Sequence, residues 1–252
     1  MLWLKKSTIA LGTALALLLA LSWIGLELDV TKFAAAANIV VFLRNDWLPP
    51  DWSVLGDAVR LSIDTLMIAF LSTFFALLVA LPLSLLAAGN VATPWLRGAV
   101  RAFLSLLRSV PEIVFGLLFV VAVGLGPFPA VLAILLHNVG VLGKLVSELV
   151  EAADPAPQEA LRAAGASRGM EALYGILPQI APNVVSQYFY RFEVAIRTSL
   201  ILGFIGAGGI GQQLFMHFKI FKYAQVTVDV IVIMALVLLA DALSAWARRK
   251  MI

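Results

Sequence analysis

Long apolar runs separated by short polar segments dominate the pattern along the chain. A helix needs roughly 17–25 mostly apolar residues to cross a hydrocarbon core about 30 Å thick. Six runs are long enough, and they lie at about residues 7–26, 58–88, 99–123, 129–150, 181–204 and 226–246. The pattern therefore predicts an all-α membrane protein with about six transmembrane helices.

The first two runs each allow more than one structure. The run at 7–26 is either a retained helix or a cleaved signal peptide with the alanines at 34–37 as its processing region. Because the run is longer than the usual signal core of about 7–15 residues, we expect a retained helix. The run at 58–88 exceeds the bilayer thickness, so we expect it to be tilted, bent at Pro82 or partly outside.

The composition excludes a water-soluble protein. Of the 252 residues, 62% are hydrophobic and only 13% are charged, whereas an ordinary soluble domain is about 45–50% apolar and about 25% charged. The absence of cysteine excludes a disulfide scaffold and a cysteine nucleophile, and two histidines leave little for a zinc or iron site. We therefore expect this chain to bind no metal and no cofactor. The net charge of +3 comes without a basic run, so nucleic acid is not an expected partner.

The distribution of lysine and arginine predicts the orientation, because these residues are retained on the cytoplasmic side of a membrane. With the N-terminus inside, nine of them fall on the cytoplasmic side and four on the outer side. Both termini are then cytoplasmic, and the polar segment 151–178 is a cytoplasmic loop. We divide the chain into an N-terminal helix with an external segment, residues 1–57, and a transmembrane domain, residues 58–252.

The cytoplasmic loop carries the signals of two short helices joined by a turn. Asp154 and Pro155 fit the N-cap and the first residue of a helix, and Gly165 is placed to end it in a left-handed conformation. Ser167 fits the cap of a second short helix, which we expect to end before Pro178. The predicted structure is a helix-turn-helix that lies across the cytoplasmic end of the bundle.

The turn of this loop, residues 163–166, is nearly free of side chains. A small turn with Glu159, Arg162 and Arg168 close by suits insertion into a groove on a partner protein. Motion of that partner would then pass into the attached spanning helices. The alternative, from the residues alone, is an ordinary solvated loop that joins two helices.

The same loop resembles a known motif. Glu159-Ala160-Leu161, Gly165 and Ile176-Leu177-Pro178 are similar to the Glu-Ala-Ala loop of bacterial ATP-binding-cassette (ABC) importer permeases, which docks into a cytoplasmic ATPase. The interval from Gly165 to Pro178 matches that family. Two departures are that Leu161 replaces the second alanine and that the isoleucine falls one residue late.

Five further segments resemble the phosphonate-importer permeases in particular. They occur in the order and at the spacing of that family, and they extend the resemblance over most of the chain from about residue 48. These segments are residues 120–128, 140–148, 174–179, 190–193 and 203–211.

The resemblance implies a type I ABC importer permease fold in the lipid bilayer of the bacterial inner membrane. Two copies of the chain form the pore, two cytoplasmic ATPase subunits bind ATP and Mg²⁺, and a soluble substrate-binding protein docks outside. The chain itself is then not an enzyme, and transport proceeds by alternating access. The implied cargo is a phosphonate or a related phosphorus oxyanion, phosphite or phosphate. The residues expected to dock the ATPase are Glu159, Ala160, Arg162, Gly165, Ser167 and Arg168.

A glycine-rich stretch follows the fifth run and satisfies the pattern GxGxxG. A dinucleotide site requires a preceding strand in a βαβ unit, whereas this stretch follows a spanning helix, so we reject a dinucleotide site. Glycines let helix backbones approach closely or let a helix break. We expect a contact between helices or between subunits, or a gate, near the outer side of the membrane. The residues involved are Gly203, Gly206, Gly208, Gly209 and Gly211.

Ionisable residues other than histidine fall inside five of the six predicted helices. A charge that faces lipid costs roughly 3 kcal/mol, so most of these residues must face protein or water or lie near the interface. Four pairs have i,i+4 spacing, which places both members on one helix face where they partly neutralise one another. The pairs are Arg60 with Asp64, Arg108 with Glu112, Lys144 with Glu148, and Glu193 with Arg197.

Arg191 has no such acidic neighbour. With the fifth helix starting near residue 181, Arg191 and Arg197 lie ~15 Å and ~24 Å along it and bracket the middle of the bilayer. Because arginine binds oxyanions well, one hypothesis places Arg191, Glu193 and Arg197 along the pathway of a small anion. The alternative is pairing between helices or subunits. We expect His137 and Asn138, in the fourth run, to be buried and hydrogen-bonded.

Three rival functions are compatible with parts of the sequence. A membrane-embedded enzyme would use the buried acid–base pairs, although no nucleophile–base constellation lies beside them. An ion-coupled secondary transporter would use the same charges with a proton or sodium gradient. The loop around Gly165 argues against both of these. A permease of the same superfamily for a different small solute is the third.

Overall fold

The computed structural model describes residues 6–27, 29 and 37–251, and the chain forms two compact units, residues 1–48 and 49–252. The first unit contains α1 (Lys6–Gly25), α2 (Ala37–Phe42) and a π-helical turn (Leu43–Trp47). Residues 8–25 of α1 are strongly apolar and long enough to cross a membrane. The first predicted helix is thus confirmed as a helix. Of the alanines considered as a processing region, residues 34–36 lie outside the described residues.

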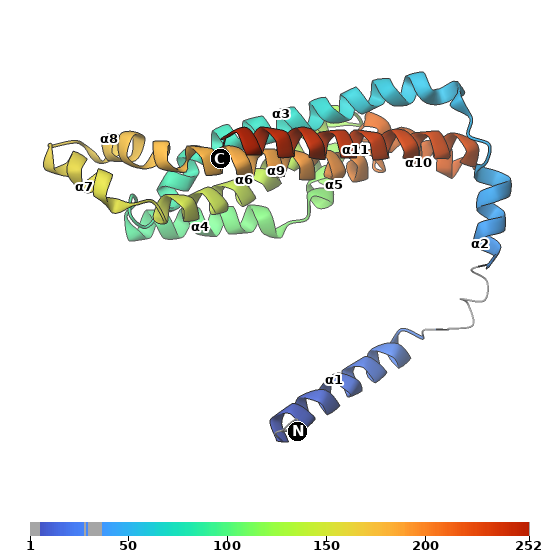
Figure 1. Ribbon diagram of the computed structural model, residues 1–252, viewed down its shortest axis with the longest axis horizontal. Coiled ribbons are helices and arrows are strands. Elements are labelled where there is room, and N and C mark those ends of the chain that lie inside the picture. The colour runs from blue at the N-terminus through green and yellow to red at the C-terminus, as the bar shows by residue number, and fades with distance from the viewer. Residues whose placement is uncertain (1–5, 28, 30–36, 252) are drawn as a thin grey trace. The chain divides into compact units, whose positions relative to one another are not determined.

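The second unit is a bundle of helices, and no strand occurs in the described part of the chain. Figure 1 shows α3, α6, α9 and α11 running alongside one another, with α7 and α8 projecting from one end of the bundle. The helices are α3 (Leu55–Ala87), α4 (Pro94–Ser109), α5 (Glu112–Val123), α6 (Pro127–Glu151), α7 (Pro155–Ala163), α8 (Arg168–Met170), α9 (Leu177–Gly203), α10 (Gly209–Lys219) and α11 (Tyr223–Met251). A 3₁₀ turn, Trp52–Val54, precedes α3, and a π-helical segment, Glu171–Ile176, precedes α9.

The described residues contain four helices that are long and apolar enough to cross a membrane, namely α1, α3, α6 and α11. Helices α4 and α5 together make a fifth candidate that is broken in the middle. Helix α9 has 27 residues but is too polar to qualify by length and composition. The nearly all-helical membrane fold predicted from the sequence is confirmed at this level.

The third apolar run is two helices rather than the single helix that the sequence predicted. Helix α4 ends at Ser109, α5 begins at Glu112, and the two are bent by 84°. Pro111 explains the break, because proline disfavours the helical conformation of the residue before it. Val110 accordingly has extended backbone angles, with φ −86° and ψ 123°.

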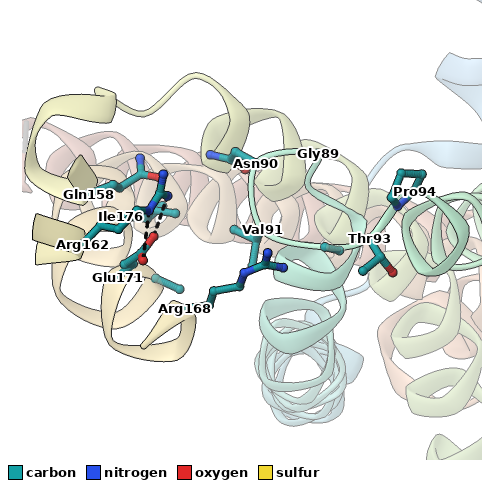
Figure 2. A pocket seen from close by; sticks show the side chains of 12 residues that line it. Gly89, Asn90, Val91, Thr93, Pro94, Gln158, Arg162, Arg168, Glu171 and Ile176 are labelled. Atoms are coloured by element: carbon teal, nitrogen blue, oxygen red, sulfur yellow. Dashed lines mark hydrogen bonds and ion pairs between the residues drawn. The ribbon is translucent and has the colours of Figure 1, made fainter. Parts of the chain in front are cut away.

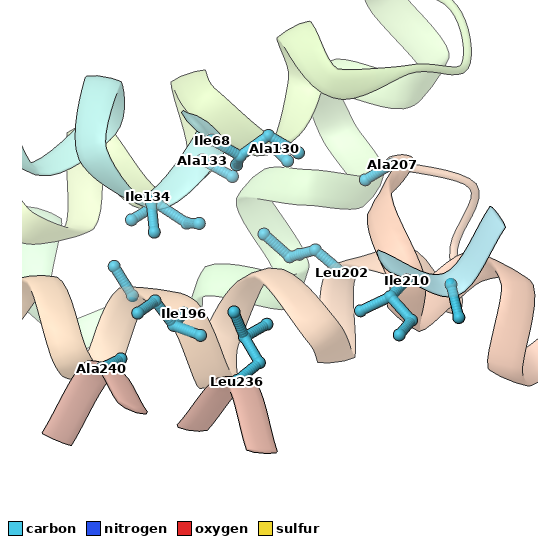
Figure 3. Close-up of a cluster of buried hydrophobic side chains, with 13 residues drawn as sticks. Ile68, Ala130, Ala133, Ile134, Ile196, Leu202, Ala207, Ile210, Leu236 and Ala240 are labelled. Carbon is cyan, nitrogen blue, oxygen red and sulfur yellow. The ribbon is translucent and has the colours of Figure 1, made fainter. Parts of the chain in front are cut away.

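The core of the bundle combines small residues with a few large aliphatic side chains. Helix α3 buries mainly alanine, serine and threonine, and small residues of this kind let helices in a membrane pack closely. Figure 3 shows the largest cluster, where Ile134, Ile196 and Leu202 lie between α6 and α9. Ile210 of α10 and Leu236 of α11 join the same cluster. The helices that carry the site are thereby fixed to one another.

Candidate functional site

The first helix of the cytoplasmic loop begins and ends as the sequence predicted. The Oδ1 atom of Asp154 accepts a hydrogen bond of 3.0 Å from the backbone of Ala156, and Pro155 is the first helical residue. At the other end Gly165 has φ +84°, in the left-handed region that favours glycine. The Gly165 N–H donates to the carbonyl oxygen of Arg162, and the Ala166 N–H donates to the carbonyl oxygen of Leu161. This is the Schellman arrangement of a helix end.

The second helix of the loop differs from the prediction. Ser167 caps it by accepting a hydrogen bond from the N–H of Met170, as expected. However, α8 is only one turn long, and the chain stays helical through the π-helical segment into α9, past Pro178. Proline is tolerated there because it lies in the first turn of α9, where its missing N–H has little effect. The loop is therefore joined to a bundle helix by continuous helical backbone.

An ion pair closes the two arms of the loop on each other. The Nη2 and Nε atoms of Arg162 lie 2.8 and 3.3 Å from the two carboxylate oxygens of Glu171, in a bidentate arrangement. Glu171 is 7% exposed. The guanidinium of Arg162 holds the pKa of the Glu171 carboxyl below its usual range. Glu171 was missed in the sequence, where only its spacing of nine residues from Arg162 hinted at a partner.

Glutamine side chains fasten the base of the same loop. Gln179 accepts a hydrogen bond of 3.0 Å from the N–H of Asp154 and donates to the carbonyl oxygens of Asp154 and Gly175. Gln158 donates to the Asp154 carbonyl as well. A Cβ atom on Gly175 would lie 3.2 Å from side-chain atoms of Gln158 and Leu161, so this glycine allows close contact between the arms. We call residues 154–179, fastened in this way, the coupling hairpin.

The outer surface of the coupling hairpin is exposed and mixed in character. Glu159, Ala160 and Gly165 are exposed on α7 and its turn, and so are Ser167 and Arg168 on the other arm. Beside them lie three exposed hydrophobic side chains that the sequence did not single out as site residues, Met170, Leu173 and Tyr174. Their spacing of three and four residues was the available signal. Such a surface is suited to a protein partner.

A cleft of ≈ 570 Å³ separates the coupling hairpin from residues 89–94, which comprise most of the loop between α3 and α4 and the first residue of α4 (Figure 2). Arg162 and Glu171 meet on the hairpin side, while the side chain of Arg168 extends toward the α3–α4 loop. That loop is fixed to the end of α6, because Glu151 accepts hydrogen bonds of 2.6 Å from the N–H of Gly89 and from Arg101. The cleft is thus bounded by well-anchored walls and carries an excess of positive charge.

Inside the bundle, Arg191 is buried and bonded to a neighbouring helix. It is 9% exposed, and its Nε atom donates a hydrogen bond of 2.9 Å to Oδ1 of Asn138 on α6, to which Nη2 also donates. Asn138 in turn lies 3.4 Å from Thr73 on α3. This arrangement matches the inter-helix alternative for Arg191, while its place along a transport pathway stays a prediction.

Arg197 belongs to a network of four charged residues on α9 and α11. It lies 2.8 Å from Glu193, as the i,i+4 spacing predicted, and 3.0 Å from Asp241. Glu193 also lies 3.7 Å from Arg248. The side chains of Arg197 and Asp241 are 45% and 38% exposed, so this network reaches the surface of the single chain.

The other three predicted pairs have different outcomes. Lys144 and Glu148 form an ion pair of 3.2 Å on α6. Arg60 and Asp64 share α3, but no ion pair joins them in the described structure. The predicted pairing of Arg108 with Glu112 was wrong, because the 84° break puts them on different helices. Glu112 instead lies 3.2 Å from Nε2 of His137.

The glycine-rich stretch is a tight turn between α9 and α10, a helix that the sequence did not predict. Gly206, Gly208 and Gly209 have φ of +86°, +82° and +72°. A Cβ atom on Gly203 would lie 2.5 Å from the backbone nitrogen of Gln212, and one on Gly211 would overlap the Leu200 carbonyl oxygen. In the single chain these glycines therefore provide close contact between the two helices.

The family model for binding-protein-dependent transport system inner membrane components matches residues 80–252, which include the coupling hairpin and the whole of α9 and α11. The chain belongs to this family. It is accordingly a non-catalytic permease subunit that crosses the bacterial inner membrane several times, and ATP hydrolysis is the task of a separate subunit.

Known relatives agree with this membership. The chain is 40% identical to the phosphite transport system permease protein PtxC of Stutzerimonas stutzeri, over 92% of this chain and 84% of that protein. It is 35% identical to the phosphate-import permease protein PhnE of Mycolicibacterium smegmatis, over 85% of this chain and 40% of that protein. A solved chain of the MetNI methionine ABC transporter in an inward-facing conformation superposes with a TM-score of 0.69, at 22% identity, over 80% of this chain and 98% of that one. This last likeness concerns the fold.

Proposed function

We propose that a pair of these permease subunits forms the membrane pore of an ATP-driven importer for a phosphorus oxyanion, with phosphite, phosphonate and phosphate as candidate cargoes. The observation that carries the proposal is the coupling hairpin, an anchored structure with an exposed small turn at one end of the bundle. The names of the relatives support the choice of cargo.

The proposed topology has six spans and both termini in the cytoplasm. The spans are α1, α3, the broken pair α4–α5, α6, α9 and α11. With 27 residues, α9 is about 40 Å long and reaches across a bilayer despite its polarity. Of its charged residues, Arg191 is bonded to Asn138 of α6, and Arg197 is paired with Asp241 of α11. The coupling hairpin then lies on the cytoplasmic side, where the ATPase is.

Two ATPase subunits with bound ATP and Mg²⁺ dock on the coupling hairpins of the two copies. The exposed turn at Gly165 enters a groove on the ATPase, and Glu159, Arg168 and the apolar side chains beside them make the surrounding contacts. Closure of the ATPase pair moves the hairpin as one piece. Because its second arm continues into α9, the movement passes into the bundle and opens it toward the soluble binding protein outside.

The charged network on α9 and α11 marks the face that meets the second copy or the water-filled pathway. Arg197 and Asp241 are partly exposed in the single chain, and each charge facing lipid would cost roughly 3 kcal/mol. A shallow pocket of ≈ 410 Å³ lined by Gln187, Tyr190 and Arg248 opens near the same helices. Cover by a second copy or by water avoids that cost.

Reconstitution tests the proposal. The permease, its cognate ATPase and its cognate binding protein would be assembled in liposomes, and uptake of phosphite, methylphosphonate, phosphate and, as a control solute, methionine would be measured with and without ATP. The proposal expects ATP-dependent uptake of at least one phosphorus oxyanion and none of methionine. Uptake driven by an ion gradient without the ATPase, or uptake only of a solute without phosphorus, contradicts it.

A further inference from the structure

One side chain of α6 bridges the two helices on either side of the α4–α5 break. The Nδ1 atom of His137 lies 3.1 Å from the carbonyl oxygen of Val110, the residue that follows α4. Its Nε2 atom lies 3.2 Å from Oε1 of Glu112, the first residue of α5. Both ends of the 84° break are therefore held from a third helix.

The two contacts of His137 cannot both be attractive when the histidine is neutral and Glu112 is ionised. One additional proton is needed. A carbonyl oxygen only accepts hydrogen bonds, so Nδ1 of His137 must donate to Val110. In a neutral imidazole Nε2 then has a bare lone pair, which would repel the carboxylate of Glu112 at 3.2 Å. Attraction requires an added proton, either on Nε2 or on the carboxyl group.

The surroundings leave His137 as the principal contact of Glu112. The side chains of the two residues are 13% and 25% exposed, so water screens the pair only in part. Arg191, with Tyr190 beside it on α9, interacts electrostatically with Glu112 from the other side but is bonded to Asn138. Two further side chains lie near the break.

These two side chains lie on α4 and α3. Arg108, in the last turn of α4, is exposed. From α3, Thr73 contacts Asn138, the residue after His137, and it is uncharged. Arginine keeps its charge in proteins, so His137 and Glu112 are the groups named here that exchange a proton.

We propose that His137 and Glu112 form a proton-dependent latch that holds the broken span α4–α5 in its bent form. With the proton present, Val110 and Glu112 are both tied to α6. When the proton leaves, the contact between Nε2 and the carboxylate becomes repulsive, and α5 is released from α6 at its first residue. The latch makes the bend in the middle of the span depend on pH, and both residues act by positioning α5 rather than by touching cargo.

The absence of natural cysteine allows a direct measurement across the break. Trp95→Cys on α4 and Val121→Cys on α5 replace side chains that are 83% and 88% exposed, and both would carry a spin label. Pulsed electron paramagnetic resonance on the full-length protein in nanodiscs would give the distance distribution from about pH 5 to about pH 8, the interval in which histidine side chains change charge. We expect one narrow distribution at the acidic end and a broadened or second distribution at the alkaline end.

The variant Glu112→Gln separates the shape of the pair from its proton. Its amide nitrogen donates to Nε2 of neutral His137, so both contacts form without an added proton. The labels should then give the narrow distribution at every pH. The matched control is Glu148→Gln, which removes the carboxylate that is paired with Lys144 on α6, the helix of His137. This variant should keep the pH dependence of the unchanged protein.

The proposal is overturned when the unchanged protein gives the same distribution at both ends of the pH range, or when Glu112→Gln responds to pH as the unchanged protein does. His137→Phe should give the broad distribution at every pH. Where that variant fails to assemble, the comparison of Glu112→Gln with Glu148→Gln decides. The measurement uses neither cargo nor ATPase, so its outcome is independent of the proposed transport function.

Discussion

Arg162 and Glu171 face each other across the coupling hairpin, with two guanidinium nitrogens 2.8 and 3.3 Å from two carboxylate oxygens. The contact ties α7, which carries the exposed turn, to the π-helical segment that leads into α9. A force applied at the turn is therefore delivered to α9 by two routes, the covalent chain and this ion pair. The pair makes the hairpin stiff enough to act as a lever.

Breaking this ion pair should uncouple ATP hydrolysis from uptake. In Glu171→Gln only one oxygen can still accept from Arg162, because the amide NH₂ is a donor, so the charged bidentate contact is lost. We therefore expect uptake per ATP hydrolysed to fall severalfold while the ATPase still binds. The measurement is the ratio of uptake to phosphate release in proteoliposomes. The double variant Arg162→Glu with Glu171→Arg restores the pair in reverse and should recover coupling better than either single change. Equal coupling in the unchanged protein and in Glu171→Gln contradicts this role.

The same pair should make the hairpin sensitive to acid. Arg162 lowers the pKa of Glu171 in the folded hairpin, so the pair contributes stability that is full above the unfolded pKa of glutamate, about 4.3, and is lost as the pH falls through the lower folded pKa. The distance between spin labels at Ala163→Cys and Tyr174→Cys should stay constant from neutral pH to about 4.5. Below about pH 4.5 the distribution of distances should broaden. Adding Glu171→Gln should remove this transition, and a transition that persists would assign it to another group.

The sequence was sufficient to predict the elements whose signals are local. The N-cap at Asp154, the left-handed Gly165 and the spanning helix that became α6 depend on neighbours within a few residues, so they could be read directly. Contacts between segments carry no such signal. The nine-residue spacing of Arg162 and Glu171 was only a weak hint of their contact. The bonding of Arg191 to Asn138 left no local signal, because these residues are 53 positions apart.

Two helix boundaries were also beyond the sequence. The break at Pro111 was missed because apolar residues continue on both sides of it, so the run read as one span. Conversely, Pro178 was expected to end a helix, but the π-helical segment before it allows helical backbone to continue. The same residue type thus ends one helix and lies in the first turn of another.

Close contact between α9 and α10 should make Gly211 sensitive to the smallest added side chain. A methyl group there overlaps the Leu200 carbonyl oxygen, so Gly211→Ala should destabilise the protein by about 1–3 kcal/mol. Gly98, on α4, has nothing within 4 Å of the position of an added Cβ, and Gly98→Ala should be neutral or stabilising by up to about 1 kcal/mol. Thermal unfolding in detergent compares the two, and equal midpoints contradict the packing role.

Paired substitutions separate the structural role of Arg191 from a role in transport. Asn138→Leu leaves the buried guanidinium without its acceptor and should cost about 1.5–3 kcal/mol. Adding Arg191→Met removes the unpaired charge and should restore most of the loss in thermal unfolding. The pathway hypothesis further expects this stable double variant to take up little cargo, whereas normal uptake would remove Arg191 from the pathway.

In the proposed mechanism the coupling hairpin receives the movement of a separate ATPase. Site-specific crosslinking tests it most directly, because a single cysteine introduced at Ala164, in the exposed turn, is unique in the chain. With the cognate ATPase present we predict a crosslink from Ala164→Cys to the ATPase whose yield changes when ATP is added, and none from Val121→Cys on α5. No crosslink from the turn, in an assembly that still shows ATP-dependent uptake, would contradict the account.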